Sequence, residues 1–304
     1  MEQQRTTIHV PVLLQQVIDV LAPEAGQCVI DCTLGGGGHA EALLAQLGPS
    51  GRYVGVDTDL HAIERVRARL QNDARLITVV GNFRSLESLV RAAGVSTADR
   101  ILFDLGLSSD QLEVEGRGFS FIRDEPLVMT LDAVPDPEAL TAWHVVNEWS
   151  ETSLADVIYG FGGETRARKI AKAIVDARVE APINSTAQLA DIVSHAYGRY
   201  RSKVHPATKT FQAIRMAVND ELGSLEAGLA QAYDLLSEGG RVAVISFHSL
   251  EDGAVKRTFR AWQADGKGTI ITKKPMIGDR LEVLANPRAR SAKLRCFEKR
   301  APDR

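Results

Sequence analysis

The sequence predicts an α/β protein with a mostly parallel sheet, a C-terminal antiparallel hairpin and an inserted all-helical domain. Short apolar runs typical of buried strands alternate with helical patterns over the first hundred residues, and a glycine-rich turn follows the first run. Strand patterns then stop between about residues 110 and 204 and resume afterwards. Strands that alternate with helices join a parallel sheet through right-handed crossovers.

Residues 28–105 contain four strand patterns and three helical patterns. Leu60, Ile63, Val66 and Leu70, for example, have the spacing of one face of an amphipathic helix. The strands are expected at residues 28–32, 52–57, 76–80 and 101–105, and the helices at residues 40–47, 60–70 and 86–93.

The middle of the chain carries helix signals instead of strand patterns. Asp136 followed by Pro137 predicts a helix start, because Asp suits the N-cap and Pro the first helical position. Ser185 and Gln188 have the spacing of a capping box at the start of another helix. We therefore expect the inserted helical domain to occupy residues 110–204.

The larger domain is expected to combine residues 1–109 with residues 205–304. A long helical stretch follows the insertion and is ended by Gly239 and Gly240. The remaining elements are a fifth strand at residues 241–247, a helix at 250–262 and two last strands at 269–273 and 292–297. No helix-length pattern separates those last two strands, which favours an antiparallel hairpin.

Composition narrows the class of protein. No apolar run approaches the roughly 18 to 20 residues that a membrane helix needs, and residues 1–10 lack a hydrophobic signal core. We therefore expect a cytoplasmic protein without a membrane partner. The three cysteines, Cys28, Cys32 and Cys296, offer no second ligand pair for zinc, so we predict no metal site.

Basic residues gather in two segments although the net charge is −3. Residues 166–218 hold 10 Lys and Arg against 3 Asp and Glu, and residues 251–304 hold 14 against 7. Together they would form an electropositive face that attracts phosphates, provided that the fold brings them together. The alternative is a solvated surface with uneven charge, and the charge pattern leaves both interpretations open.

A glycine-rich turn and a later carboxylate predict a nucleotide-type site. Gly35 to Gly38 follow the first strand and open the first helix, so the backbone can approach a ligand closely. Asp57 ends the second strand, where a carboxylate accepts hydrogen bonds from ribose hydroxyls. The alternative is a turn whose glycines only permit tight packing of the strand on the helix.

The surrounding residues favour S-adenosylmethionine over NAD as the ligand. Asp31 precedes the glycines and would repel an anionic pyrophosphate, whereas the ammonium and sulfonium groups of S-adenosylmethionine tolerate a carboxylate neighbour. Phe83 follows the third strand at the depth expected for an adenine, although a core position explains it equally well. A terminal hairpin also suits methyltransferases better than dehydrogenases.

Long motifs cover nearly the whole chain in one order. They are DCTLGGGGH (31–39), GNF (81–83), DLGLSSDQ (104–111), RGFSF (117–121), HPATKTFQAIR (205–215), ISFHSLED (245–252) and NPRARSAKLR (286–295). With these motifs the chain resembles the bacterial RsmH (MraW) family of S-adenosylmethionine-dependent ribosomal RNA methyltransferases.

This resemblance implies a Rossmann-like methyltransferase fold whose inserted helical domain recognises the substrate. It also implies methylation of the N4 amine of cytidine 1402 in 16S ribosomal RNA of the small subunit. By motif, the cofactor contacts are Gly37, Gly38, His39, Asp57, Phe83, Asp104 and Gln111. Val128 and Thr130 stand where the family usually has an acid and an arginine, a departure on the substrate side of the pocket.

Methyl transfer to an exocyclic amine needs a positioned nitrogen and an acceptor for its N–H groups. Asp104, at the end of the fourth strand, is the candidate catalytic acceptor, and holding the cofactor is its alternative role. Candidates for substrate binding are Ser108, Arg215, Asn219, His248, Arg288 and Arg290. For His248, Arg288 and Arg290 a purely structural role is the alternative.

Two other functions share some of these features. A NAD-dependent oxidoreductase would carry the same glycine turn and Asp57. An RNA-binding or assembly factor with a vestigial S-adenosylmethionine site would share the basic segments, and Val128 and Thr130 give this alternative some weight. The sequence leaves open whether the substrate is naked RNA or an assembled subunit, and whether the protein is a monomer or a homodimer.

Overall fold

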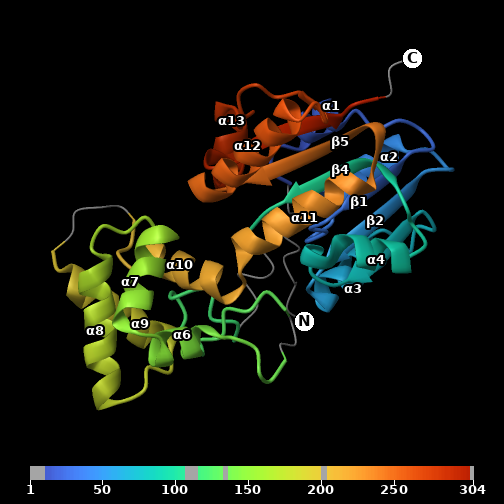
Figure 1. Ribbon diagram of the computed structural model, residues 1–304. Coiled ribbons are helices and arrows are strands. Elements are labelled where there is room, and N and C mark those ends of the chain that lie inside the picture. Colours follow the sequence, from blue (N-terminus) through green and yellow to red (C-terminus); the bar gives the residue numbers. More distant parts are fainter. Residues whose placement is uncertain (1–10, 107–115, 133–135, 200–203, 302–304) are drawn as a thin grey trace. The chain divides into compact units, whose positions relative to one another are not determined.

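The computed structural model describes residues 11–106, 116–132, 136–199 and 204–301. The chain divides into two units (Figure 1): unit 1 comprises Met1–Ser108 and Leu222–Arg304, and unit 2 comprises Ser109–Glu221. Unit 1 contains a sheet with a hydrophobic core on each of its two faces, whereas unit 2 has a separate core formed by its own helices.

Unit 1 is built on a seven-stranded sheet with the strand order β3-β2-β1-β4-β5-β7-β6. The neighbours from β3 to β5 are parallel, whereas β7 runs antiparallel to both β5 and β6. The strands are β1 (Cys28–Asp31), β2 (Arg52–Asp57), β3 (Leu76–Val80), β4 (Ala98–Asp104), β5 (Leu236–Ser246), β6 (Gly268–Ile270) and β7 (Lys293–Lys299). The predicted α/β class, with its parallel sheet and antiparallel C-terminal strands, is confirmed.

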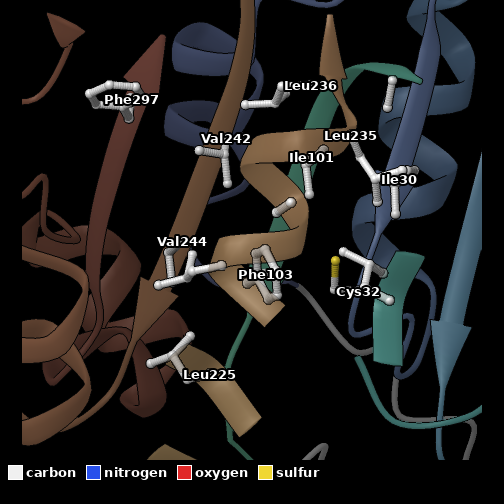
Figure 2. Packing of buried hydrophobic residues seen from close by; sticks show 14 of the residues in the cluster. Ile30, Cys32, Ile101, Phe103, Leu225, Leu235, Leu236, Val242, Val244 and Phe297 are labelled. Atoms are coloured by element: carbon white, nitrogen blue, oxygen red, sulfur yellow. The ribbon is translucent and has the colours of Figure 1, made fainter. Parts of the chain in front are cut away.

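Helices cover both faces of this sheet, which explains why its strands are apolar on both sides. Val29 and Ile30 are neighbours on β1 but belong to different cores, because successive side chains of a strand point to opposite faces. Figure 2 shows the core on one face, where Ile30, Phe103 and Leu225 pack. This core receives α4 (Leu86–Ala92), α11 (Glu221–Leu235) and α12 (Ser249–Ala264), and the other receives α1 (Leu14–Leu21), α2 (Gly38–Gln46) and α3 (Leu60–Arg69).

The C-terminal segment contains a short helix that the sequence analysis did not expect. The helix α13 (Arg280–Ala285) and the 3-10 turn η2 (Pro287–Arg290) lie between β6 and β7 along the chain. Asp279 begins α13 by accepting a hydrogen bond from the Glu282 backbone N–H at 2.8 Å. This cap was visible in the sequence, but six residues are too few to show a helical period.

The regular secondary structure of unit 2 is helical in its described residues, apart from one isolated bridge between Pro126 and Ser185. Its helices are α6 (Ala142–Glu148), α7 (Glu151–Gly160), α8 (Ala167–Glu180), α9 (Thr186–Tyr197) and α10 (Thr208–Val218). The capping box of Ser185 and Gln188 is confirmed at the start of α9. The helix start predicted at Asp136 is wrong: Asp136 begins a turn by accepting from the Glu138 N–H, and α6 begins only at Ala142.

Unit 2 ends at Glu221 rather than at the predicted residue 204. The reason is packing, since Phe211 and Ile214 of α10 belong to the same core as Ile170 of α8. The helical stretch that was expected to run on to the fifth strand is also divided in two. Asp220 adopts a left-handed φ of 42° between α10 and α11, which interrupts the helix.

No helix within the described ranges has both the length and the apolar character required to cross a membrane.

Gly118 and Gly116 offer a matched test of the loop that precedes α6. Both have positive φ, 72° and 85°, but a Cβ at Gly118 would collide with the Pro126 carbonyl, whereas a Cβ at Gly116 would meet no described atom within 4 Å. We expect Gly116→Ala to lower the free energy of unfolding by about 1 kcal/mol from backbone strain, and Gly118→Ala by roughly 1 to 3 kcal/mol more from overpacking. Urea unfolding followed by tryptophan fluorescence measures both, and equal losses would contradict the packing described here.

Candidate functional site

Three strand-end carboxylates lie at one edge of the sheet. Asp31, Asp57 and Asp104 are the last residues of β1, β2 and β4. Because β1 is paired in parallel with both β2 and β4, these three carboxyl ends face the same edge. Ligands of open α/β sheets bind at this edge, so it is the candidate active site.

The glycine turn connects β1 to α2 at this edge. Gly37 is the N-cap of α2 with φ 71°, and a Cβ there would lie 2.8 Å from Val66. A Cβ on Gly38 would lie 2.9 Å from Pro11, so tight packing explains these two glycines. It does not explain Gly36, where no described atom lies within 4 Å of an added Cβ. Gly36 leaves open space beside the backbone, as a closely approaching ligand requires.

Asp57 is tied to the glycine turn. Its Oδ2 accepts a hydrogen bond from the Gly35 backbone N–H at 2.7 Å, and its Oδ1 accepts from the Asp59 N–H at 2.8 Å. Asp59 in turn caps α3. A carboxylate offers about four acceptor sites, so the bond to Gly35 is compatible with the predicted bond to a ribose. That role toward a ribose stays a prediction.

Asp31 and Asp104 are linked by Thr33, which the sequence analysis did not name. Asp31 accepts from the Tyr53 hydroxyl at 2.8 Å and from the Thr33 N–H at 3.1 Å. The Thr33 hydroxyl accepts from the Asp104 backbone N–H at 2.6 Å. Tyr53 was missed as well, although a tyrosine within an apolar strand signals that its hydroxyl has a polar partner. The expected contact of Asp31 with a cation stays a prediction.

The carboxylates of Asp31, which is buried, and of Asp104, which is partly buried, make this edge favourable for a cation. Burial raises the pKa of Asp31 to about 6, although hydrogen bonds from Tyr53 and Thr33 oppose this increase. Burial also raises the pKa of Asp104 to about 8, with contributions from the nearby negative charges of Asp31 and Glu251, while Arg288 acts in the opposite direction. A bound cation offsets the cost of burying negative charge here and reduces the repulsion between the two carboxylates.

His39, an expected cofactor contact, is buried at the start of α2. Its Nε2 lies 3.1 Å from the Val12 carbonyl oxygen, and its Nδ1 lies 3.5 Å from Asp104 Oδ2. The other oxygen of Asp104, Oδ1, is buried and has no hydrogen-bond partner in the part of the chain that the structure describes. Buried acceptors are normally satisfied, which makes Oδ1 a candidate ligand contact.

Of the two remaining predicted cofactor contacts, the structure describes Phe83 but not Gln111. Phe83 begins the 3-10 turn η1 (Phe83–Ser85) and is partly buried, with its ring centroid 5.4 Å from that of Phe103 in an edge arrangement. It therefore contributes to the core, and its contact with an adenine stays a prediction. Gln111 lies outside the described residues, as does the substrate candidate Ser108.

Among the described substrate candidates of unit 1, His248 has a structural partner in Glu251. His248 is the N-cap of α12, accepts from the Glu251 N–H at 3.4 Å, and places Nε2 3.0 Å from Glu251 Oε1. Arg288 and Arg290 lie on η2, where Arg290 is exposed and Arg288 is close enough to affect the pKa of Asp104. Contacts of all three residues with RNA stay predictions.

In unit 2, Arg215 and Asn219 hold neighbouring protein groups. Arg215 forms two hydrogen bonds with Glu221, at 2.7 and 2.9 Å. The Asn219 side chain accepts from the Leu131 N–H and donates to the Met129 carbonyl, both at 2.8 Å. These bonds brace the segment that carries the departures Val128 and Thr130, and Thr130 itself is buried. Binding of RNA by Arg215 and Asn219 stays a prediction.

Similarity to solved structures is weak. A putative rRNA methylase from Clostridium thermocellum has a TM-score of 0.44 at 13% identity, covering 97% of this chain and 100% of that one. A putative methyltransferase from Streptococcus mutans, solved in complex with SAH, has a TM-score of 0.45 at 10% identity, covering 96% of this chain and 99% of that one.

Similarity in sequence is much stronger. A relative from Thermomicrobium roseum called ribosomal RNA small subunit methyltransferase H is 44% identical, over 100% of this chain and 97% of the relative. A relative of the same name from Deinococcus radiodurans is 45% identical, over 97% of this chain and 91% of the relative. The model of the MraW methylase family matches residues 6–300. This match confirms the family resemblance and, with it, S-adenosylmethionine as the cofactor, and it gives no support to the dehydrogenase alternative. The chain belongs to the MraW methylase family.

Proposed function

We propose that this protein uses S-adenosylmethionine to methylate ribosomal RNA of the small subunit, at the N4 amine of cytidine 1402 of 16S RNA. The carrying observation is the buried Asp104 Oδ1, which has no hydrogen-bond partner among the described residues and lies at the carboxyl edge of the sheet. The names of the relatives support ribosomal RNA as the substrate. The choice of cytidine and of N4 rests on the family resemblance.

The residues at the edge fit the cofactor. Gly36 leaves space for a ligand against the backbone, and Asp57 stands where ribose hydroxyls need an acceptor. Asp31 supplies negative charge for the ammonium and sulfonium groups, and Asp104 supplies an acceptor oxygen, Oδ1. The bound cofactor supplies a methyl group on a positively charged sulfur, which an aligned nitrogen lone pair can displace.

The chemistry of the substrate explains why an acceptor such as Asp104 is needed. The lone pair of the N4 amine is conjugated with the cytosine ring, so the nitrogen is a poor nucleophile. A carboxylate oxygen that accepts one N–H bond pulls the nitrogen toward tetrahedral geometry and orients its lone pair. When Asp104 is ionised, the same oxygen can also receive the proton that leaves after methyl transfer. Asp104 Oδ1 is the described acceptor that meets these requirements.

Exposed basic residues occur in both units and support an RNA partner. In unit 2, Arg166, Arg168 and Lys169 are exposed at the start of α8. In unit 1, Arg290 is exposed on η2. Phosphate contacts from such residues act additively and weaken as salt rises. By contrast, Lys293 and Arg295 form ion pairs with Asp252, so we do not assign them to RNA.

Mass spectrometry of ribosomal RNA tests the proposal and separates it from the assembly-factor alternative. RNA from cells that lack this gene should lose one methyl group on N4 of cytidine 1402, and the Asp104→Asn variant should fail to restore it. An assembly factor with a vestigial site would leave the methyl group in place while small-subunit assembly suffers. Loss of a methyl group from another nucleotide would keep the enzyme class and refute the assigned position.

Asp57→Ala tests the ribose contact. The change removes the acceptor for the ribose and for the Gly35 N–H, which leaves buried polar groups unpaired at a cost of about 1 to 3 kcal/mol. We expect a loss of S-adenosylmethionine affinity of roughly ten- to a hundredfold by calorimetry. Unchanged affinity in a folded variant would rule out the ribose assignment.

The pKa values of the two buried carboxylates predict how stability depends on pH. Both are raised above the ordinary value of 3.8, to about 6 for Asp31 and about 8 for Asp104, so the folded state binds more protons than the unfolded state in this range. The free energy of unfolding of the cofactor-free protein should therefore fall as pH rises through 6 and then through 8.

Asp104→Asn should abolish the decrease between about pH 6 and pH 8 and leave only the contribution of Asp31 below pH 6. Urea unfolding between about pH 5 and pH 9 measures both parts. A variant that loses stability with pH as steeply as the wild type above pH 7 would show that Asp104 ionises normally.

Arg290→Glu tests the RNA surface of unit 1. Arg290 is chosen without Arg288, because Arg288 also affects the pKa of Asp104. We expect weaker binding of small-subunit RNA, and the dependence of this binding on salt concentration should fall by the equivalent of about one phosphate contact. The affinity for S-adenosylmethionine should stay within about twofold of the wild-type value. Arg67→Glu is the control, since Arg67 is exposed in the last turn of α3 and belongs to neither basic segment. Equal effects of both variants would refute a localised surface, and a much lower melting temperature for Arg290→Glu would indicate a structural role.

A further inference from the structure

The position of the proton on His39 follows from its partner at Val12. A carbonyl oxygen only accepts hydrogen bonds, so the nitrogen 3.1 Å from it, Nε2, carries the hydrogen. The neutral ring then has its lone pair on Nδ1. Val12 lies just ahead of α1, and His39 is buried, so this tautomer is selected within the core.

That lone pair faces a second acceptor. Nδ1 lies 3.5 Å from Asp104 Oδ2, and an ionised carboxylate opposite an unprotonated nitrogen would place two acceptors face to face. One proton between them removes this repulsion, whether it is drawn on Oδ2 or on Nδ1. Hydrogen bonds at catalytic groups are often long in the ligand-free state and shorten when the substrate binds.

The surroundings of Asp104 indicate that this proton is retained at neutral pH. Asp31 from β1 and Glu251 from α12 place negative charge nearby, and Arg288 from η2 places positive charge, while His39 approaches from α2. With burial as the largest contribution, the pKa of Asp104 is raised to about 8. A protonated carboxyl that was free to rotate could present its O–H at Oδ1 and would then be a poor acceptor for an amine.

We propose that His39 is a positioning residue for Asp104: it holds one shared proton on the Oδ2 side and thereby presents Oδ1 as an acceptor for an N–H donor at neutral pH. The unpartnered, buried Oδ1 is the second observation that points to such a donor. The donor is either the ammonium group of the cofactor or the exocyclic amine of the base. The second source rests on the proposed function, and the first does not.

The tautomer is measured first, on the full-length protein without ligand. Nitrogen-15 NMR of the imidazole rings should show His39 with hydrogen on Nε2 and a Nδ1 signal that changes in Asp104→Asn. The exposed His61, which is paired with Glu64, provides an internal comparison that should not respond to this variant. A neutral His39 with hydrogen on Nδ1, or a Nδ1 signal that is indifferent to Asp104→Asn, would overturn the proposal.

Two variants then separate the nitrogens of the ring. In His39→Gln the side-chain amide can still reach the Val12 carbonyl but offers nothing at the Nδ1 position, whereas in His39→Asn the amide replaces Nδ1 and loses the bond to Val12. His61→Gln is the matched control on an exposed histidine. His39→Gln should require Asp104 to ionise before Oδ1 can accept, so its function should fall about tenfold per pH unit below a midpoint near 8 and recover above it. His39→Asn, which keeps a polar partner for Oδ2, should show a smaller dependence on pH.

Two readouts distinguish the donors. If the donor is the ammonium group, the new pH dependence appears in S-adenosylmethionine affinity measured by calorimetry. If it is the base amine, affinity stays flat and the dependence appears in single-turnover methylation of unmethylated small-subunit particles at saturating cofactor. A loss that is equal at every pH would mean a merely structural role and would overturn the proposal, as would no dependence in either readout. Absence of any methylation by the wild type, with a pH-dependent affinity in His39→Gln, would refute the proposed function and leave the role of His39 supported.

Discussion

The hydrogen bond from the Asp104 N–H to the Thr33 hydroxyl connects the ends of β1 and β4, and the geometry of the site depends on it. Thr33 lies in the short segment between Asp31 and the glycine turn, so this bond ties Asp104 to the residues that lead from β1 to the start of α2. It is a bond between backbone and side chain, and β pairing alone does not supply it, because the β1–β4 register ends at Asp31 and Leu102. A site built on strand ends therefore needs a short polar side chain to continue the alignment beyond the sheet.

The same arrangement carries an energetic cost. Two carboxylates that are buried close together destabilise the ligand-free protein, and the Tyr53 hydroxyl and the Thr33 N–H offset only part of this cost. A ligand with positive charge removes the rest, so part of the binding energy comes from the relief of strain already present in the fold. Stability without ligand and affinity for a cation are thus opposed at the same two residues.

The sequence predicted the sheet well because its strands are apolar on both faces and end at turn residues or carboxylates. Bounds at β2 and β3 agree with the expected ranges residue for residue. Prediction failed at α13, because six residues are too few to show a helical period. It also failed at Asp136, where a motif typical of a helix N-cap begins a turn instead. Asp57 and Asp104 were found because strand ends are recognisable, whereas Thr33 and Tyr53 act through contacts between elements that no periodicity encodes. The end of unit 2 was missed for a similar reason, since the core membership of α10 is a tertiary property.

The division of unit 1 into two stretches of chain affects how the protein must fold. Asp104 pairs with Ile245 in the β4–β5 register, so the centre of the sheet closes only after the whole of unit 2 has been synthesised. During that interval β4 is an edge strand with unpaired backbone groups, and such edges recruit other chains. A unit 2 that folds early on its own core shortens the disordered loop between the two strands and lowers the entropy lost when they meet. Fast folding of the insertion would then protect the nascent sheet from aggregation, a benefit that is independent of the reaction at the sheet's edge.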